Sequence, residues 1–274
     1  MNITEIENLE IDILLDAIYK RYGYDFRNYA RASLKRRIFN FIKKNKLNRP
    51  SEIIAELLYN EQLFNEFICN ISITVTEMFR DPTFYKTIRE KVVPYLKIYP
   101  FIKIWHAGCA TGEEVYSLAI LLKEEDLYDR CKIYATDFND RALNDAKEAI
   151  YPIEQIKKHT LNYQKAGGKK SFSDYYHSEY DSVIMDSSLK KNITFANHNL
   201  VADASFGEMN IIICRNVLIY FNKSLQNHVL DLFNDSLITN GFLCLGNKES
   251  LMFSDIENKY SDFEKKEKVY QKRK

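Results

Sequence analysis

A short glycine-containing turn between a predicted strand and a predicted helix carries the clearest chemical signal in the sequence. The apolar run FIKIWHA at 101–107 leads into Gly108, Cys109, Ala110, Thr111 and Gly112, and EEVYSLAILL follows with the apolar spacing of a helix. Glycines at such a turn let the backbone approach a ligand closely, and a helix N-terminus favours negative groups. We therefore expect a nucleotide-like cofactor over this turn.

The residues around the turn favour a methyl donor over a dinucleotide. GCATG lacks the GxGxxG spacing that holds a dinucleotide pyrophosphate against a helix. Glu113 and Glu114 would repel a diphosphate, whereas they can receive the cationic amino group and the hydroxyls of S-adenosylmethionine. Asp137 ends the next strand, CKIYATD, where a carboxylate can accept hydrogen bonds from ribose hydroxyls. A surface turn followed by a well-capped helix has a similar sequence and stays an alternative.

A third strand adds polar and aromatic residues to the same edge. The apolar run IIIC ends in Arg215 and Asn216, followed by VLIYF at 217–221. Ligands of open α/β sheets bind at the C-terminal strand ends. The run is not the [DN]PP[YF] signature that amino-methylating DNA enzymes carry at this place, so nucleobase methylation is disfavoured.

The elements that position these residues form an α/β region. Four β-rich runs, at 101–107, 131–137, 209–216 and 241–246, alternate with helical ones, which is typical of a parallel sheet covered on both faces. A polar, tyrosine-rich stretch at about 155–197 contains two short strand candidates, DSVIMD and NITFAN. We expect a small antiparallel insertion on the sheet edge there, with a plain loop as the alternative.

The preceding residues are predicted to be helical. Residues 4–20 show apolar spacing of three and four, with Thr4 and Glu7 placed as a capping box, and further helices are expected at about 25–45 and after Pro50. Asp81 and Pro82 suit the N-cap and first position of a helix that bridges to the second half. The expected domains are a helical N-terminal domain at 1–75, a bridging segment and helix at 76–98, and a cofactor-binding catalytic domain at 99–274.

Composition limits the classes of partner and compartment. The 39 basic and 38 acidic residues nearly cancel, which speaks against general nucleic-acid or anionic-membrane binding. The five cysteines form no CxxC pair and the five histidines are scattered, so we expect free thiols and no metal site. The N-terminus lacks a signal-peptide pattern, and no apolar run approaches the roughly 20 residues that span a bilayer. These features predict a cytoplasmic protein without membrane insertion.

Four linked segments resemble one known family. ITVTEMFRDPTFY, HAGCATGEEVYSLAI, YATDFNDRALNDA and IIICRNVLIYFNKSLQ, in this order, are similar to the CheR family of chemotaxis receptor glutamate O-methyltransferases. The resemblance covers essentially the whole chain. It implies a class I, Rossmann-like S-adenosylmethionine methyltransferase domain with a small all-helical N-terminal domain and a small antiparallel β insertion. It also implies methyl transfer to glutamate carboxylates of bacterial chemoreceptors for chemotactic adaptation, with S-adenosylhomocysteine as the product.

Two other functions stay open on the sequence alone. One is a cofactor-binding regulatory protein of the same fold without turnover. Thr74 favours it, because the family usually has asparagine at this position. The other is an RNA methyltransferase that tracks the backbone with the basic residues of 27–46. The near-neutral charge and the missing amino-methylating motif disfavour this second alternative.

The resemblance implies roles for residues beside the transferred methyl. Thr76 and Arg80 match the family's threonine and arginine, whereas Met78 stands where a phenylalanine is usual. Arg80 and Tyr220 are the candidate catalytic residues: Arg80 would orient a carboxylate, and Tyr220 would form a hydrogen bond near the methyl. The reaction requires no general base, since a glutamate with a pKa of about 4.3 is already ionised at neutral pH, and neither residue needs a perturbed pKa.

The resemblance also implies a set of cofactor contacts. Glu114 would hold the amino-acid portion and Asp137 the ribose, while Asn199 and Leu200 would flank the adenine. Arg215 with Asn216 would line the cleft. The complete set of expected cofactor-binding residues is Thr74, Thr76, Arg80, Gly108, Glu114, Asp137, Asn199, Leu200, Arg215 and Asn216.

A basic helix is the candidate receptor-binding element. Residues 27–46 carry eight basic side chains and no acid. The resemblance suggests that Arg31, Lys35 and Arg36 meet the cytoplasmic, glutamate-bearing helices of a methyl-accepting chemotaxis receptor, with a solvated outer face as the alternative. In this family the insertion, here at about 155–197, can dock a receptor's C-terminal peptide by strand addition. We expect a monomer and no nucleic-acid partner.

Overall fold

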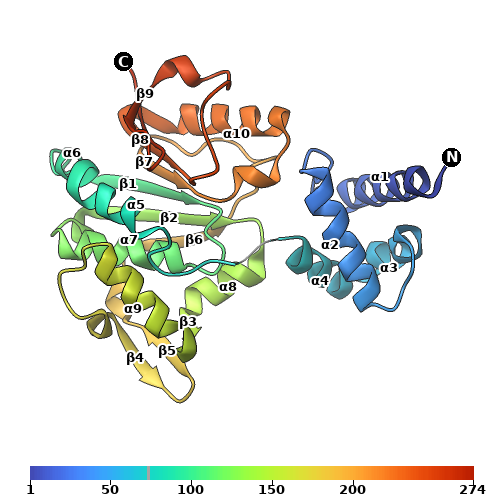
Figure 1. The fold of residues 1–274 in the computed structure, drawn as a ribbon, viewed down its shortest axis with the longest axis horizontal. Helices are drawn as coiled ribbons and strands as arrows, with labels where there is room; N and C mark the ends of the chain where they lie inside the picture. Colours follow the sequence, from blue (N-terminus) through green and yellow to red (C-terminus); the bar gives the residue numbers. More distant parts are fainter. Residues whose placement is uncertain (73–74) are drawn as a thin grey trace. The chain divides into compact units, whose positions relative to one another are not determined.

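Contacts within the chain group it into two units, which are described separately. The computed structural model describes residues 1–72 and 75–274 (Figure 1). In these described parts, the first unit comprises residues 1–72 with 218–228, and the second comprises residues 75–217 with 229–274. The second unit contains a seven-stranded sheet and a three-stranded sheet.

The first unit is an assembly of short and medium helices. It contains α1 (Ile3–Tyr22), α2 (Arg31–Lys44), α3 (Ile54–Tyr59) and α4 (Glu61–Ile71), with a 3-10 turn at Pro50–Ile53. Residues 218–228 add a 3-10 turn (Leu218–Tyr220) and the start of α10 (Lys223–Ser236). Its buried apolar side chains include Ile11, Leu14, Ile18, Leu34, Ile38, Phe41, Leu57, Phe64 and Phe67.

The start of α1 differs from the sequence prediction. The predicted capping box of Thr4 and Glu7 is wrong, because the helix begins two residues earlier with Asn2 as its N-cap. The Asn2 side chain accepts a hydrogen bond from the Glu5 backbone N–H, and the Glu5 carboxylate accepts one from the Asn2 backbone N–H, each at 2.9 Å. Asparagine is at least as good a cap as threonine, so the earlier start is favoured.

The start of α2 is also later than predicted. The helix begins at Arg31 rather than near residue 25. The Asp25 carboxylate accepts hydrogen bonds from both the backbone N–H and the guanidinium of Arg27, at 2.8–3.1 Å. An aspartate that bonds its own chain two residues on stabilises a turn, so this segment stays outside the helix.

The predicted parallel sheet is confirmed in the second unit. The strands β1 (Ile102–Ala107), β2 (Cys131–Asp137), β7 (Met209–Cys214) and β8 (Leu237–Leu245) are joined as parallel neighbours, with β1 between β2 and β7. The antiparallel strands β10 (Val269–Lys272) and β9 (Tyr260–Glu264) complete one edge. The strand order changes direction at β1, because β2 lies on one side of it and β7 on the other. Ligands of such sheets bind at the carboxyl ends of the strands beside this point.

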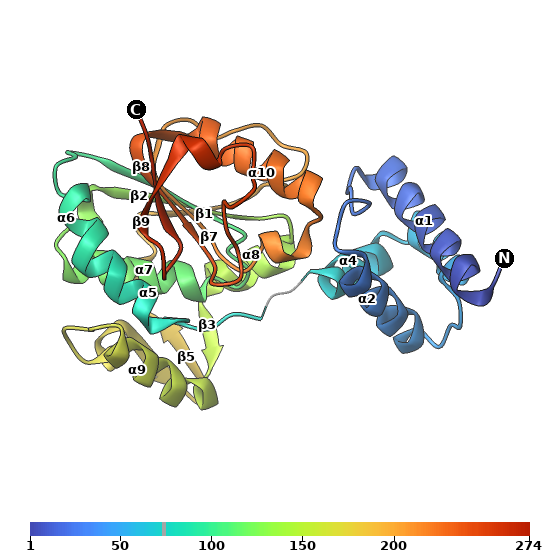
Figure 2. The same ribbon diagram turned by 45° about the horizontal axis from the view of Figure 1, so that its top comes forward.

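Helices cover both faces of this sheet (Figures 1 and 2). The helices α5 (Pro82–Thr87), α6 (Val93–Leu96) and α7 (Glu113–Glu124) bury one set of alternate β1 side chains, including Ile102 and Ile104. Trp105 points to the other face, where its ring centroid lies 5.3 Å from that of Phe233 of α10. Because both faces of the sheet are covered, the sequence of β1 is mostly apolar instead of alternating between apolar and polar residues.

The bridging helix is present, but it is not a regular α-helix. A π-helical turn at Ile88–Val92 separates α5 from α6, so that the helical segment runs from Pro82 to Leu96. Pro94 lacks a backbone N–H, so it disfavours the regular α-helical hydrogen bonds to the preceding turn. The segment stays helical because Phe84, Tyr85 and Val92 are buried in the main core.

The predicted antiparallel insertion is confirmed as a sheet of three short strands. Its strand order is β3 (Ile150–Pro152), β5 (Ser182–Met185) and β4 (Tyr176–Glu179), and α9 (Ile156–Lys165) lies between β3 and β4 in the chain. The second strand candidate, NITFAN, belongs instead to the main sheet as β6 (Ile193–Asn197). It pairs in parallel with β2 over five residue pairs. It therefore extends the main sheet and is not part of the insertion.

Two further observations concern the described residues only. Among them, no helix has both the length and the apolar character needed to cross a membrane. They also contain no group of His, Cys, Asp and Glu side chains that could hold a metal ion.

Candidate active site

The turn after β1 has a backbone that only small residues fit. Gly108, Ala110 and Gly112 alternate in the left-handed region, with φ of 75°, 47° and 90°. A Cβ on Gly108 would lie 2.5 Å from a methyl of Val217, and a Cβ on Gly112 would lie 2.9 Å from the Cβ of Ala146. The glycines are therefore required by close packing as well as by the turn itself.

Asp137 connects this turn to the end of β2. Its carboxylate accepts hydrogen bonds from the backbone N–H groups of Ala110, at 2.9 Å, and Asn139, at 3.0 Å. Burial raises the pKa of Asp137, although these backbone donors favour the charged form. A carboxylate has about four acceptor positions, so capacity remains for ribose hydroxyls. Asp137 thus fixes the turn and presents an acceptor at the C-terminal edge of the sheet.

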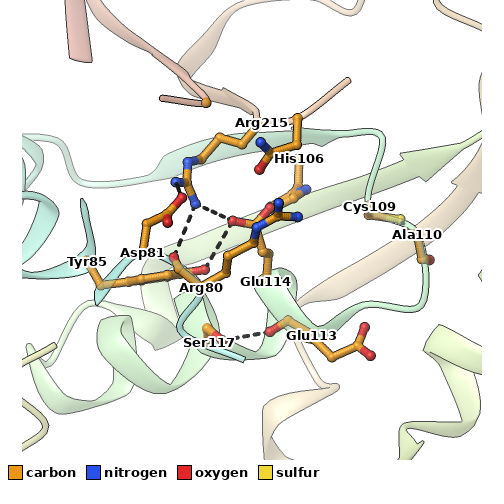
Figure 3. A network of polar contacts seen from close by, with 12 residues as sticks. Arg80, Asp81, Tyr85, His106, Cys109, Ala110, Glu113, Glu114, Ser117 and Arg215 are labelled. Atoms are coloured by element: carbon orange, nitrogen blue, oxygen red, sulfur yellow. Dashed lines mark hydrogen bonds and ion pairs between the residues drawn. The ribbon is translucent and has the colours of Figure 1, made fainter. Parts of the chain in front are cut away.

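A buried ionic cluster lies beside the turn (Figure 3). The Arg215 guanidinium donates to the Glu114 carboxylate at 2.5 Å and to the Asp81 carboxylate at 2.6 Å, and it stacks 4.1 Å from the ring centroid of Phe84. It also donates to the backbone carbonyl of Arg80 at 3.4 Å. Burial opposes its charge, but Glu114 and Asp81 outweigh that effect and raise the pKa of Arg215. The guanidinium is therefore permanently charged and held in one geometry.

Asp81 and Pro82 occupy the predicted N-cap and first positions of the helix, but the Asp81 side chain does not cap it. Asp81 makes no capping hydrogen bond at the start of α5, and its φ is 54°. Its carboxylate is bound to Arg215 instead, since a buried guanidinium gains more from a second charge than a helix gains from a cap. The same segment is attached to α7, because the Ser117 hydroxyl accepts a hydrogen bond from the Phe79 backbone N–H at 2.8 Å.

The two acids at the start of α7 face different surroundings. Glu114 joins the Arg215 cluster, whereas the Glu113 side chain points away from it (Figure 3). Glu113 accepts a hydrogen bond from the Thr111 hydroxyl at 2.7 Å. Burial raises the pKa of Glu113 to about 7. Of the two carboxylates, Glu114 is therefore the one placed to receive a cationic group.

The site fits the group that the sequence implies. The side chains of Glu114, Asp81 and Arg215 together carry one net negative charge, which suits a cationic amino or sulfonium group. Several buried polar side chains of the described residues lack a hydrogen-bond partner for at least one atom, and three of them belong to this site: Asn216 at Oδ1, Arg215 at Nε and His106 at both ring nitrogens. Buried polar atoms are rarely left unpaired, so such atoms mark a place for a ligand or water.

The remaining predicted cofactor residues are only partly placed by contacts. The backbone N–H of His198 donates to the Asp137 carbonyl at 3.1 Å, which brings the following Asn199 close to the β2 end. Asn199 shapes its own turn by accepting a hydrogen bond from Val201, and Leu200 is buried. Thr74 lies outside the described residues. The contacts of these residues with the cofactor stay predictions.

The two predicted catalytic residues belong to different units of the chain. Arg80 is partly buried, and within the described part of the chain its guanidinium has no ion-pair partner. Thr76, four residues earlier, is also partly buried. Tyr220 belongs to the first unit, where its backbone carbonyl accepts a hydrogen bond from Ala30 at 2.7 Å. Its position beside the transferred methyl stays a prediction.

The predicted receptor-binding residues divide into two kinds. Arg31 forms an ion pair with Asp12 and Lys35 forms one with Glu7, each at 2.7 Å, so both are committed to α1. Arg36 is exposed and, in the described ranges, has no such partner. The free positive charge of α2 therefore lies on the face that contains Arg36.

The sequence analysis missed several residues of the site. Tyr85 donates to Glu114 at 3.5 Å, His106 lies 3.9 Å from it, and Ser117 holds the Phe79 segment. Burial lowers the pKa of His106, so its ring is neutral near pH 7. Glu249 was also missed; it binds the loop after β7. The position of Ser117 one helical turn after Glu113 was a usable signal, whereas nothing near Glu249 pointed to its role.

Comparison with known proteins agrees with this geometry. A family model described as CheR methyltransferase, SAM binding domain, matches residues 74–269, and one described as CheR methyltransferase, all-alpha domain, matches residues 9–72. A Pseudomonas putida protein that carries the methyltransferase name Cher3 is 46% identical over 265 residues, which cover 97% of each chain. A Listeria innocua chemotaxis protein methyltransferase is 32% identical over 251 residues, 90% of this chain and 93% of that protein. The chain therefore belongs to the CheR methyltransferase family, with S-adenosylmethionine as its cofactor.

Proposed function

We propose that this S-adenosylmethionine-dependent methyltransferase methylates glutamate side chains of bacterial chemoreceptors. The observation that carries the proposal is the match to relatives named chemotaxis protein methyltransferase along nearly the full length of both chains. These include the Listeria innocua protein and a Salmonella typhimurium protein that is 26% identical over 89% of this chain and 84% of its own. The match includes the helical N-terminal domain, so it extends beyond the cofactor-binding fold.

The chemistry of the site suits an acceptor that needs no general base. When bound, S-adenosylmethionine supplies a methyl group on a positively charged sulfur. A glutamate carboxylate is ionised at neutral pH and forms the new oxygen–carbon bond as the carbon–sulfur bond breaks. His106 is neutral and only 1% exposed, so it offers no accessible base to a neutral amine or hydroxyl acceptor. This burial supports a carboxylate as the acceptor.

The chain's charged residues would divide the binding between them. Glu114 and Asp81 attract the cationic part of the cofactor, while Arg215 holds both carboxylates in place. Arg80, which has no ion-pair partner in the described residues, is the cation available to orient the attacking carboxylate of the receptor. Positioning of this kind accounts for most of the rate in a reaction without proton transfer.

The remaining predicted contacts complete the proposal. Asp137 binds the ribose hydroxyls, and the Asn199–Leu200 segment flanks the adenine. Thr76 and Asn216 contribute further polar contacts to the cofactor. Tyr220 forms a hydrogen bond near the transferred methyl.

The exposed face of α2 would bind the receptor. Arg36 and Lys43 are exposed and lie seven residues apart, so they share one face of the helix. Arg31 and Lys35 support this face indirectly, because their ion pairs with Asp12 and Glu7 attach α2 to α1. A positive face suits the glutamate-bearing helices of a receptor, and its effect on binding should weaken with salt.

The test is transfer of labelled methyl from S-adenosylmethionine to receptor-containing membranes, followed by mild alkali. Carboxyl methyl esters release methanol in alkali, whereas methylated amines do not. We expect alkali-labile label with the wild-type protein and at least a tenfold loss with Arg80→Ala. Alkali-stable label would place the acceptor elsewhere. Tight cofactor binding without label on any receptor would favour a regulatory protein.

A further inference from the structure

A buried glutamate outside the cofactor-binding set connects two loops at the C-terminal edge of the sheet. Glu249 follows β8 and is only 5% exposed. Its Oε2 accepts hydrogen bonds from the backbone N–H groups of Gly246, at 2.6 Å, and Asn216, at 3.0 Å, and its Oε1 accepts one from Val217 at 2.8 Å. One carboxylate therefore binds the loop after β7 and the loop after β8 together.

The position of this carboxylate follows from the sheet. The strands β7 and β8 are parallel neighbours, and the last pair in register is Cys214 with Leu245. Beyond this pair the ladder ends, so the next backbone N–H groups need other acceptors. The Glu249 carboxylate supplies them, and in return the three donors stabilise its buried charge. An amide or an apolar side chain at this place cannot accept three such hydrogen bonds in the same geometry.

The bound loop contains residues that the cofactor site uses. Asn216 has a φ of 61°, a left-handed conformation that asparagine adopts more readily than other residues with a side chain. Arg215, one residue earlier, reaches Glu114 and Asp81. Val217, one residue later, packs against the cofactor turn at Gly108. The conformation of this short loop thus sets both the buried cation and one wall of the site.

We propose that Glu249 is a positioning residue, which holds Arg215, Asn216 and Val217 in the conformation that binds S-adenosylmethionine. It acts through the backbone of this loop and does not itself contact the cofactor. The inference rests on the proposed cofactor-binding role of Arg215 and Asn216. It does not depend on which substrate receives the methyl group.

The first test replaces the carboxylate with an amide. In Glu249→Gln, one acceptor oxygen becomes an NH2 group that faces backbone donors, so the loop must move. We expect the Kd for S-adenosylhomocysteine, measured by calorimetry on the full chain, to rise at least tenfold. The KM for S-adenosylmethionine should rise in parallel, while the KM for the receptor stays within twofold of the wild-type value.

A matched control has the same local chemistry away from the site. The exposed Glu257 carboxylate accepts a hydrogen bond from the Phe253 backbone N–H at 2.7 Å, so it also stabilises a loop of this unit. Glu257→Gln should leave the Kd for S-adenosylhomocysteine within twofold of wild type. An equal loss in both variants would show a general loosening of the unit and would overturn the positioning role.

A second variant, Gly246→Ala, keeps the carboxylate and still tests the positioning role if Glu249→Gln fails to fold. The added methyl in Gly246→Ala would lie 2.7 Å from Glu249 Oε2 and 2.8 Å from the Asn216 backbone nitrogen, so it separates the two loops. We expect it to raise the Kd at least fivefold, with circular dichroism unchanged. If either folded variant binds S-adenosylhomocysteine as tightly as wild type, the inference is overturned. If wild type binds the cofactor but methylates no receptor, the proposed function fails while the positioning role still stands.

Discussion

The molecule carries charge in two contrasting ways, in the buried Arg215 cluster and on the exposed face of α2. In the cluster, Arg215 has a side chain that is 0% exposed and is bound by two carboxylates at 2.5 and 2.6 Å. On α2, Arg36 and Lys43 are exposed and, in the residues that the structure describes, have no ion-pair partner. A buried charge is costly unless its partners are fixed, whereas an exposed charge is solvated and free to move.

This difference indicates two kinds of recognition. A fixed cluster can select a small cofactor by geometry, because moving any member leaves another charge unpaired. An exposed basic face selects a partner by the sign of its charge, and ions in solution screen it over about 8–10 Å. The cofactor site should therefore respond strongly to single substitutions, and the basic face weakly and in a salt-dependent way.

The largest effect is expected for Arg215→Met. Removal of the cation leaves the buried Glu114 and the partly exposed Asp81 without a counter-charge, which costs about 3–5 kcal/mol of stability. Urea unfolding followed by fluorescence of Trp105, the one tryptophan of the chain, reports on the second unit. Arg36→Met on the exposed face is the control and should change stability by less than about 0.5 kcal/mol. A loss of stability below about 1 kcal/mol for Arg215→Met would contradict the contrast between the buried cluster and the exposed face of α2.

A pH-dependent effect is expected at Glu113, whose pKa of about 7 compares with 4.5 for the free side chain. Between these two pH values the folded state keeps a proton that the unfolded state has lost. The contribution of Glu113 to stability therefore falls as pH rises through this window, by about 3–4 kcal/mol at about 1.4 kcal/mol per pKa unit.

Glu113→Gln should remove this dependence. The stability of the variant relative to wild type should rise by about 3–4 kcal/mol between pH 4 and pH 8, measured by urea unfolding at each pH. Glu90→Gln, at an exposed position of the bridging helix, serves as the control. Parallel pH profiles for Glu113→Gln and wild type would show that Glu113 is ionised in the folded state.

A smaller effect is expected for Asp137→Asn, read as cofactor affinity. Loss of the charged acceptor should weaken S-adenosylhomocysteine binding by about tenfold to a hundredfold, since hydrogen bonds to charged groups contribute about 1.5–3 kcal/mol. Asp129→Asn is a matched control, because this exposed carboxylate lies at the other end of β2. Unchanged calorimetric affinity in Asp137→Asn would exclude Asp137 from the cofactor site.

The smallest effect is expected on the basic face. The pair Arg36→Glu and Lys43→Glu should raise the KM for receptor about threefold to tenfold at low salt, with cofactor affinity unchanged. The increase should largely disappear at about 0.5 M salt. Lys20→Glu, an exposed cation on α1, is the control. An equal increase in the control, or an increase that persists at high salt, would argue against α2 as the receptor-binding helix.

The sequence predicted the fold well where hydrophobic pattern decides it. β1, β2, β7 and β8 appear as continuous apolar runs, because both faces of the sheet are covered. The prediction was wrong where a short strand candidate had more than one available partner. NITFAN could pair within the insertion or along β2, and only the three-dimensional ladder with Ile133 decides between them.

The site was predictable in part for a similar reason. The strand ends at Asp137 and Arg215 carry polar residues in otherwise apolar runs, so they were visible in the sequence. Asp81 followed by Pro82 has the appearance of a helix cap, and its pairing with Arg215 joins residues 134 positions apart. Glu249 also acts on distant backbone groups, which no local spacing reveals. Long-range polar contacts are the part that the sequence alone left out.

The central claim is that this chain places methyl groups on glutamate carboxylates of chemoreceptors. Tandem mass spectrometry of receptor fragments, incubated with the chain and S-adenosylmethionine, tests it most directly. The predicted result is methylation of glutamate side chains that mild alkali removes and that Asp137→Asn reduces at least tenfold at limiting cofactor. Methyl groups on lysine or another side chain, resistant to alkali, would contradict the claim.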